Sequence, residues 1–565
     1  MFSNKKNVNI LTSELIEFGI QNIVVCPGSR NAPIVHNLNQ HPYFQLYPIT
    51  DERSAAFAAI GISIATQKPT AVCVTSGSAL LNTLPAVAEA YYRYCPLLII
   101  SADRPEERIG QLDGQTLIQN RALEPYATTL QLCEPQNQQE EEESIRKIEE
   151  GLSSLFKNAK QPFHINVPIS EPLFQFTTPL LPKVSVSSTI KKGESEEFST
   201  EDINNIKRAK LPVLFIGHFD THPLPYDTFE KNHQLLVLPE IVGNTNLAWR
   251  TTIIEELGDR LGIQPDVVIH IGGNIVNKKL KQILQQSKDC KVFRIEPGKD
   301  SPNTFFHLEK IIRGETLSVL DKLLEKSLPS NKNIAVFQER LKCIHESLNN
   351  LLDYNPSHFS DLGVMQKIAQ KIFSIKKDYV IHLANSSVVR NATYFFGSNY
   401  QNIYCNRGVN GIEGSLSTAV GHSLVYNGIV FVFIGDLSFF YDNNALWNNS
   451  LKGNLRIFLF NNGGGQIFNR LEGLKESQAY NFISADHSFT AKGIAEAFNI
   501  DYYAAHDYTE IESYLCTMTE ESSNRPKILE IFTLQNNNHA DLIKMHEYYQ
   551  LTYKQKSYEK KLDHH

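Results

Sequence analysis

Two short polar segments, each placed directly after an apolar run, form the clearest chemical pattern in the sequence. Gly435-Asp436 follows IVFVFI, and Asn461-Asn462 follows LRIFLF and precedes three glycines. Carboxylate, amide and main-chain carbonyl oxygens are the ligands that Mg²⁺ prefers, and glycines let the backbone approach a diphosphate closely. Either segment alone could be a helix cap or an ordinary turn. Both together, at this spacing, indicate a site for Mg²⁺ and a diphosphate.

Parallel β-sheets are needed to bring such strand ends together. Short apolar runs alternate with helical patterns in three successive series, which predicts an α/β fold of three domains, each a mainly parallel sheet flanked by helices. Ligands bind at the carboxyl ends of strands in such sheets. A segment rich in Pro, Ser, Lys and Glu at 178–205 predicts a linker, and the pattern breaks again at 327–333. The predicted domains are residues 1–180, 196–345 and 355–565.

The bulk properties limit the class of protein. A chain of 565 residues is too long for one hydrophobic core, and a net charge of -7 provides no basic field for nucleic acid. The eight cysteines lack C-x-x-C spacing, so we expect reduced thiols. The sequence contains neither a signal-like apolar segment at its start nor an apolar run long enough to span a bilayer. We therefore expect a cytoplasmic protein without membrane insertion.

The Gly-Asp and Asn-Asn segments resemble the cofactor motif of the thiamine diphosphate enzyme superfamily, with Leu437 in place of the commoner glycine. The resemblance implies that Asp436 and Asn462 bind Mg²⁺ or Mn²⁺ through their side chains and Gly464 through its carbonyl. It also implies that Glu52, in the charged triplet after QLYPIT, hydrogen-bonds the aminopyrimidine ring and promotes removal of the thiazolium C2 proton. Without this match, Glu52 would more often be a solvated surface residue.

Several further segments resemble one family within this superfamily. They are PGSRNAPI (27–34), DERSAAFAAIG (51–61), TSGSALLNTLPAVAEA (75–90), SADRPEER (101–108), NRGVNGIEGSLSTAVG (406–421) and NNGGGQIF (461–468). This set resembles the 2-succinyl-5-enolpyruvyl-6-hydroxy-3-cyclohexene-1-carboxylate synthases of menaquinone biosynthesis over nearly the whole chain, and least over 196–345. The resemblance implies a transferase that decarboxylates 2-oxoglutarate and joins the succinyl carbanion to isochorismate by 1,4-addition.

The resemblance also implies roles for individual residues. Both substrates carry two carboxylates, which arginines can grip with paired hydrogen bonds, although a single strand-end arginine is more often an ion-pair partner. The implied substrate contacts are Ser29, Arg30, Arg104, Gln115, Ser386, Arg390 and Arg407, with Ser29 and Arg30 directed to isochorismate. The implied cofactor contacts are Glu52, Ile412, Gly435, Asp436, Leu437, Ser438, Asn462, Gly464, Ile467 and Phe468. Lys278 and Lys279 match a basic pair of the family less closely.

Two alternatives remain open at this level. Another thiamine diphosphate-dependent 2-oxo acid decarboxylase or acetolactate synthase-like carboligase would share Glu52, Asp436 and Asn462 but not Ser29-Arg30 and Arg407. A noncatalytic binding protein with repeated Rossmann-like domains would need a G-x-G-x-x-G or Walker A segment, which the sequence lacks. In the family the cofactor lies between two subunits, so the resemblance implies a homodimer or a dimer of dimers.

Overall fold

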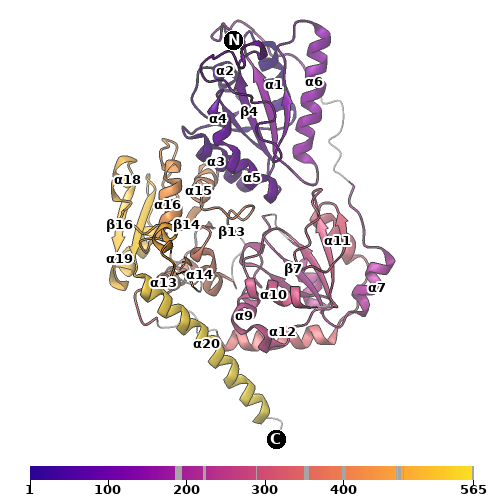
Figure 1. Cartoon of the computed structure of the whole chain (residues 1–565), viewed down its shortest axis with the longest axis vertical. Helices are drawn as coiled ribbons and strands as arrows, with labels where there is room; N and C mark the ends of the chain where they lie inside the picture. Colours follow the sequence, from indigo (N-terminus) through magenta and orange to yellow (C-terminus); the bar gives the residue numbers. More distant parts are fainter. Residues whose placement is uncertain are drawn as a thin grey trace.

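The computed structural model describes residues 1–184, 194–220, 224–287, 289–348, 356–397, 402–465, 467–468, 473–474 and 476–562. Residue 355 and residues 563–565, at the limits of the third predicted domain, lie outside this part. Three parallel sheets, each flanked by helices, follow one another along the chain (Figure 1). The predicted α/β class is therefore confirmed.

The first sheet has the strand order β2-β1-β3-β4-β6-β5. Its central strands are buried along their whole length, as expected for apolar runs covered by helices on both faces. The strands are β1 Asn22–Val25, β2 Gln45–Pro48, β3 Thr70–Val74, β4 Leu97–Asp103, β5 Thr128–Gln131 and β6 Phe163–Pro168. The helices are α1 Lys6–Glu17, α2 Ala32–Gln40, α3 Glu52–Thr66, α4 Ser78–Asn82, α5 Leu84–Arg93 and α6 Gln138–Ser153.

The second sheet has five strands in the order β11-β10-β9-β7-β8. Its strands are β7 Pro212–Ile216, β8 Leu236–Pro239, β9 Val267–Ile271, β10 Lys291–Glu296 and β11 Leu308–Arg313. Its helices are α7 Thr200–Arg208, α8 Tyr226–Lys231, α9 Trp249–Leu257, α10 Lys278–Gln286, α11 Thr316–Leu324 and α12 Lys332–Ser347. The linker predicted at 178–205 extends too far, because α7 already begins at Thr200. Ser199 caps this helix and forms a capping box with Asp202.

The third sheet has the order β13-β12-β14-β15-β17-β16, which repeats the connectivity of the first sheet strand for strand. Its strands are β12 Tyr379–Leu383, β13 Ile403–Tyr404, β14 Ile429–Gly435, β15 Leu455–Asn461, β16 Asp501–Ala505 and β17 Lys527–Phe532. Its helices are α13 Asp361–Ser374, α14 Ser387–Phe396, α15 Ser415–Val425, α16 Asp436–Asp442, α17 Tyr480–Ser484, α18 Lys492–Ala497, α19 Tyr508–Thr519 and α20 Gln535–Leu562. The chain thus contains two copies of one topology.

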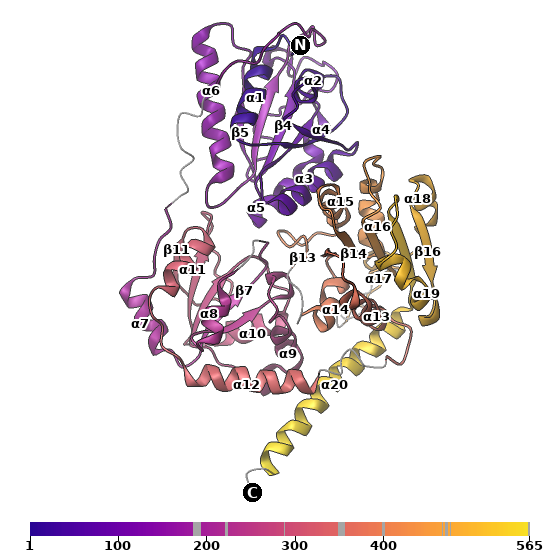
Figure 2. The ribbon, with the colours of Figure 1, turned by 180° about the vertical axis from the view of Figure 1, so that it is seen from behind.

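Helices α3 and α15 join the first and third domains and lie side by side in both views (Figures 1 and 2). A Cβ atom on Gly61 would overlap the carbonyl oxygen of Thr418, and one on Gly421 would overlap the carbonyl oxygen of Ala58. The two glycines therefore allow the helix backbones to touch. The far end of α20 extends away from the three domains (Figure 2).

All eight cysteines are free thiols, as their spacing predicts. Among the described helices, none combines the length and the apolar character needed to cross a bilayer.

Candidate active site

The Gly-Asp and Asn-Asn segments lie next to each other because β14 and β15 are neighbouring parallel strands. Asp436 begins α16 at the carboxyl end of β14. Its Oδ2 accepts hydrogen bonds from the main-chain N–H groups of Asn462, Gly463 and Gly464 at 2.9–3.1 Å, and its Oδ1 accepts one from Leu437 at 2.7 Å. We call Asp436 together with residues 462–464 the metal loop, after the metal ligands that the sequence predicts there. The carboxylate holds this glycine-containing backbone in one conformation.

The environment of Asp436 is buried and includes a histidine. Burial raises the pKa of the Asp436 carboxyl, while its N–H donors and the nearby His487 ring act in the opposite direction. His487 Nε2 lies 3.4 Å from Asp436 Oδ2, and its ring stacks on Phe489. The sequence pattern did not single out His487, because it lies 51 positions from Asp436 (487 − 436) in a segment without regular spacing.

A second carboxylate, Asp361, orients Asn462. The amide nitrogen of Asn462 donates to Asp361 Oδ2 at 3.2 Å, and the Thr533 hydroxyl donates to Asp361 Oδ1 at 2.6 Å. Burial raises the pKa of Asp361 to about 6, so the group is mainly ionised at neutral pH. Because an ionised carboxylate only accepts hydrogen bonds, the amide nitrogen must face it, and the Asn462 oxygen is directed elsewhere. Asp361 thus orients the predicted metal ligand Asn462 from outside the metal loop, as carboxylates commonly do for metal ligands.

The metal loop has the properties that Mg²⁺ and a diphosphate require. No described residue donates a hydrogen bond to the Gly464 carbonyl, and a Cβ atom at Gly435 would meet no heavy atom within 4 Å. The described residues contain no group of three or more His, Cys, Asp or Glu side chains arranged to hold a metal. A site of one carboxylate, one amide and one carbonyl oxygen suits a hard cation that takes its other ligands from phosphate and water. The residues present therefore fit the implied cofactor.

A cavity of about 460 Å³ lies between the central and third domains, within the size range of small-molecule sites. It brings together five of the predicted substrate and cofactor contacts, namely Ser386, Arg390, Arg407, Ile412 and Ile467. The central domain contributes residues 274–278 and Lys281. Four cationic side chains, Lys278, Lys281, Arg390 and Arg407, line this one space. The cavity is therefore suited to anions.

Arg407 is buried, with 7% of its surface exposed, and no described carboxylate lies within ion-pair distance of it. Its charge is felt by the buried Glu240, where it partly offsets the rise in pKa that burial causes. Its Nη1 donates to Asn385 Oδ1 at 3.1 Å and its Nη2 to the Ile275 carbonyl at 2.9 Å, while its Nε has no partner among the described residues. Both acceptors are neutral. A buried guanidinium held by neutral acceptors keeps its charge available to an anionic ligand.

The predicted lysine pair is divided by the geometry of α10. Lys278 lines the cavity together with Lys281, three positions later on the same helix face. Lys279 points elsewhere, since its Nζ lies 3.0 Å from Asp259 Oδ2. The second lysine in the cavity is therefore Lys281 and not Lys279. The sequence pattern did not single out Lys281, although helical spacing from Lys278 could have indicated it.

Predicted residues of the first domain lie at the carboxyl edge of its sheet. Ser29 and Arg30 follow β1, and Arg30 donates to the Ile169 carbonyl and to Glu171, each at 2.8 Å. Arg104 follows β4, and its Nε donates to the Gly114 carbonyl at 3.0 Å, next to Gln115. These residues do not line the cavity within the same chain.

Glu52 begins α3 and accepts a hydrogen bond from Asn82 at 3.1 Å. Its neighbours Asp51 and Arg53 bind Asn444 and the Tyr441 carbonyl, beyond the first turn of α16. Among the described residues, no hydrogen bond or ion pair joins Glu52 to the metal loop or to the cavity of its own chain.

The other predicted cofactor contacts lie in segments next to the metal loop or line the cavity. Leu437 and the buried Ser438 lie in the first turn of α16. The Phe468 ring lies against Gly465, directly after the loop. Ile412, 39% exposed, lies in the segment before α15 and faces the cavity.

Residues 6–123 match a family model described as "Thiamine pyrophosphate enzyme, N-terminal TPP binding domain". This match, the repeated sheet topology and the metal loop define the class: the protein is a thiamine diphosphate-dependent enzyme.

Curated relatives narrow the class. The chain is 37% identical to the 2-succinyl-5-enolpyruvyl-6-hydroxy-3-cyclohexene-1-carboxylate synthase of Bacteroides thetaiotaomicron, over 95% of this chain and 97% of the relative. It is 37% identical to the synthase of Phocaeicola vulgatus, over 97% and 99%, and 36% identical to that of Christiangramia forsetii, over 91% and 93%. The chain belongs to the 2-succinyl-5-enolpyruvyl-6-hydroxy-3-cyclohexene-1-carboxylate synthase family.

Proposed function

We propose that the enzyme decarboxylates 2-oxoglutarate and adds the remaining four-carbon unit to isochorismate, giving 2-succinyl-5-enolpyruvyl-6-hydroxy-3-cyclohexene-1-carboxylate and CO₂ in menaquinone biosynthesis. The observation that carries this proposal is the cavity with four cationic side chains beside Ile467, which follows the metal loop. Both substrates are dicarboxylates, so their binding requires several cations in one place. An acceptor without carboxylates would leave the buried guanidinium of Arg407 without an anionic partner.

The residues of the third domain hold the cofactor and the 2-oxo acid. Asp436, Asn462 and the Gly464 carbonyl bind Mg²⁺ or Mn²⁺, which carries the diphosphate of thiamine diphosphate. Bound thiamine diphosphate supplies the carbon nucleophile that activates the 2-oxo group. Arg390 and Arg407, with Ser386, bind and orient substrate carboxylates. Ile412, Ile467 and Phe468 exclude water and support the cofactor ring.

A second subunit completes the site in this proposal. Glu52 hydrogen-bonds the aminopyrimidine ring, and Ser29, Arg30, Arg104 and Gln115 contact the substrates, all from the first domain of a partner chain. In support of this, no hydrogen bond or ion pair joins Glu52 to the metal loop of its own chain among the described residues, where Glu52 instead accepts a hydrogen bond from Asn82. A site shared between chains implies a homodimer or a dimer of dimers. Each chain would consist of the domains 1–180, 196–345 and 355–565. The free thiols support the expected cytoplasmic location.

The shared site can be tested by mixing two inactive variants. Glu52→Gln and Asp436→Ala each damage both sites of a homodimer. In a mixed dimer with shared sites, one site receives both damaged domains and the other receives two intact ones, so activity returns. If each site lay within one chain, mixing would restore nothing.

The reaction itself is tested by omitting components. An assay with thiamine diphosphate, Mg²⁺, 2-oxoglutarate and isochorismate should show loss of isochorismate together with CO₂ release, and no product when any component is missing. Release of CO₂ with isochorismate untouched would indicate a different acceptor. No activity with any 2-oxo acid would refute the proposal.

A further inference from the structure

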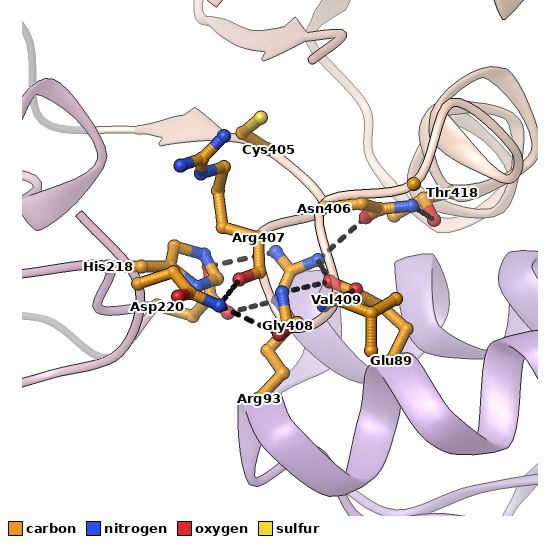
Figure 3. Close-up of polar contacts among 12 residues, drawn as sticks. Glu89, Arg93, His218, Asp220, Cys405, Asn406, Arg407, Gly408, Val409 and Thr418 are labelled. Atoms are coloured by element: carbon orange, nitrogen blue, oxygen red, sulfur yellow. Dashed lines mark hydrogen bonds and ion pairs between the residues drawn. The ribbon is translucent and has the colours of Figure 1, made fainter. Parts of the chain in front are cut away.

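The segment 405–411, which we call the Arg407 loop, is held by side chains from all three domains (Figure 3). It carries Arg407 into the cavity at one end and leads to Ile412 at the other. Glu89 and Arg93 of α5 belong to the first domain, and neither residue lines the cavity.

Glu89 binds the loop through its backbone. Its Oε1 accepts the N–H of Gly408 and its Oε2 accepts the N–H of Val409, both at 2.8 Å. The side chain is almost completely buried, with 1% exposed. A Cβ atom at position 408 would clash with the main-chain oxygen and the carboxylate of Glu89, so α5 and the loop meet backbone to backbone. One carboxylate therefore fixes the two residues that follow Arg407.

Arg93, one turn after Glu89, ties the same loop to the central domain. Its Nη1 donates to Asn406 Oδ1 at 2.8 Å, and its other nitrogens bind both carboxylate oxygens of Asp220 (Figure 3). Asp220 also lies 3.2 Å from His218 Nε2. Side chains of α5 thus bind Asn406, before Arg407, as well as Gly408 and Val409, after it.

The opposite side of the loop is bound by Asn274 of the central domain. Its amide donates to the carbonyls of Arg407 and Gly408 at 2.6 and 2.8 Å. The Arg407 main chain is therefore held between Glu89 on one side and Asn274 on the other. Side chains on a backbone fixed in this way keep a precise direction.

We propose that Glu89 is a positioning residue that sets Arg407 for binding of the substrate carboxylate. The inference rests on the proposed function, because it takes Arg407 as a substrate contact. Glu89 does not line the cavity. It acts through the N–H groups of Gly408 and Val409 and through an ion pair with Arg93 at 3.9 Å, and Arg93 binds Asn406 of the same loop. Loss of one of these bonds weakens substrate binding more than it slows the reaction of bound substrate.

Glu89→Gln keeps the shape of the side chain but turns an amide nitrogen toward one of the two N–H donors. We expect the KM for 2-oxoglutarate to rise about tenfold, the value of one hydrogen bond to a charged group, with kcat within about twofold. Hydrogen exchange of peptides covering 405–411 should become faster, while thiamine diphosphate affinity stays unchanged. Asp266→Asn is the matched control, because Asp266 also accepts two consecutive N–H groups, from Lys210 and Leu211, away from the loop. Its KM should be that of the wild type.

A double-mutant cycle separates positioning from general damage. In an Arg407→Ala background, Glu89→Gln should raise KM no further, because there is no guanidinium left to position. A full additional rise would overturn the proposal, and so would a wild-type KM in Glu89→Gln when Arg407→Ala alone raises KM. A wild-type KM in Arg407→Ala would overturn the substrate role of Arg407 and the positioning role together. If Glu89→Gln does not fold, Glu89→Asp, which keeps the charge on a shorter side chain, is subject to the same comparisons.

Discussion

Gly435→Ala should lower the affinity of the protein for its cofactor without lowering the stability of the folded chain. The backbone at Gly435 has φ -82° and ψ 161°, a conformation that alanine adopts without strain. A Cβ atom there would meet no heavy atom within 4 Å, so the folded chain itself accommodates the methyl group. Replacing glycine by alanine at a compatible position typically stabilises a protein by about 0.4–1 kcal/mol, because the unfolded chain loses freedom. We therefore expect an unchanged or slightly raised melting temperature without cofactor.

The methyl group would occupy the space that we assign to the cofactor diphosphate. Extra atoms in a close-packed site cost about 1–3 kcal/mol, which corresponds to a loss of roughly 5- to 150-fold in affinity. Thiamine diphosphate affinity, measured by fluorescence or circular dichroism titration in excess Mg²⁺, should fall by this factor. The melting temperature with saturating cofactor should fall relative to the wild type.

Gly493→Ala is the control for this prediction. Gly493 lies on the exposed face of α18 in the same domain, and its added Cβ atom would also meet nothing within 4 Å. Its thiamine diphosphate affinity should equal that of the wild type. Wild-type affinity in Gly435→Ala would refute our placement of the diphosphate. A large loss of stability without cofactor would refute the steric reasoning.

Four further predictions concern catalysis, metal, substrate and pH. Glu52→Gln should keep thiamine diphosphate binding but lose about 10²–10⁴-fold in turnover, since the proton transfer is weakened, and wild-type turnover would exclude Glu52 from that role. Asp436→Ala should abolish Mg²⁺-dependent cofactor binding. An unchanged thiamine diphosphate titration at limiting Mg²⁺ would exclude the metal loop as the site of the metal. Arg30→Ala should raise the KM for isochorismate more than that for 2-oxoglutarate, and equal rises in steady-state assays would contradict a specific isochorismate contact. Burial raises the pKa of Asp442, which accepts two hydrogen bonds from Ser417, to about 6. Its ionised form is therefore disfavoured in the fold, and the penalty is present above pH 6 and disappears as the pH falls toward 4. Between pH 4 and 7.5 the wild type should lose up to about 3 kcal/mol of stability relative to Asp442→Asn, and parallel denaturation curves for the two proteins would contradict this.

The fold class and the metal loop were accessible from the sequence because both depend on local pattern. Continuous apolar runs such as LRIFLF are characteristic of strands covered on both faces, and their alternation with helices predicts parallel sheets. The order of elements then places the ends of β14 and β15 side by side. Asp436 and Asn462 could be paired in this way although they are 26 positions apart (462 − 436).

The supporting residues were decided only by the tertiary structure. Asp361 meets Asn462 across 101 positions, and Glu89 meets Gly408 across 319. No spacing in the sequence predicts such pairs, because each depends on how whole sheets and helices pack and on the direction in which one hydrogen bond points. The packing of α3 against α15 likewise decides what the start of α3 meets in its own chain, where Asp51 binds Asn444. The sequence by itself determined which residues can do the chemistry, and the packing of the three domains determined which of them one chain brings together.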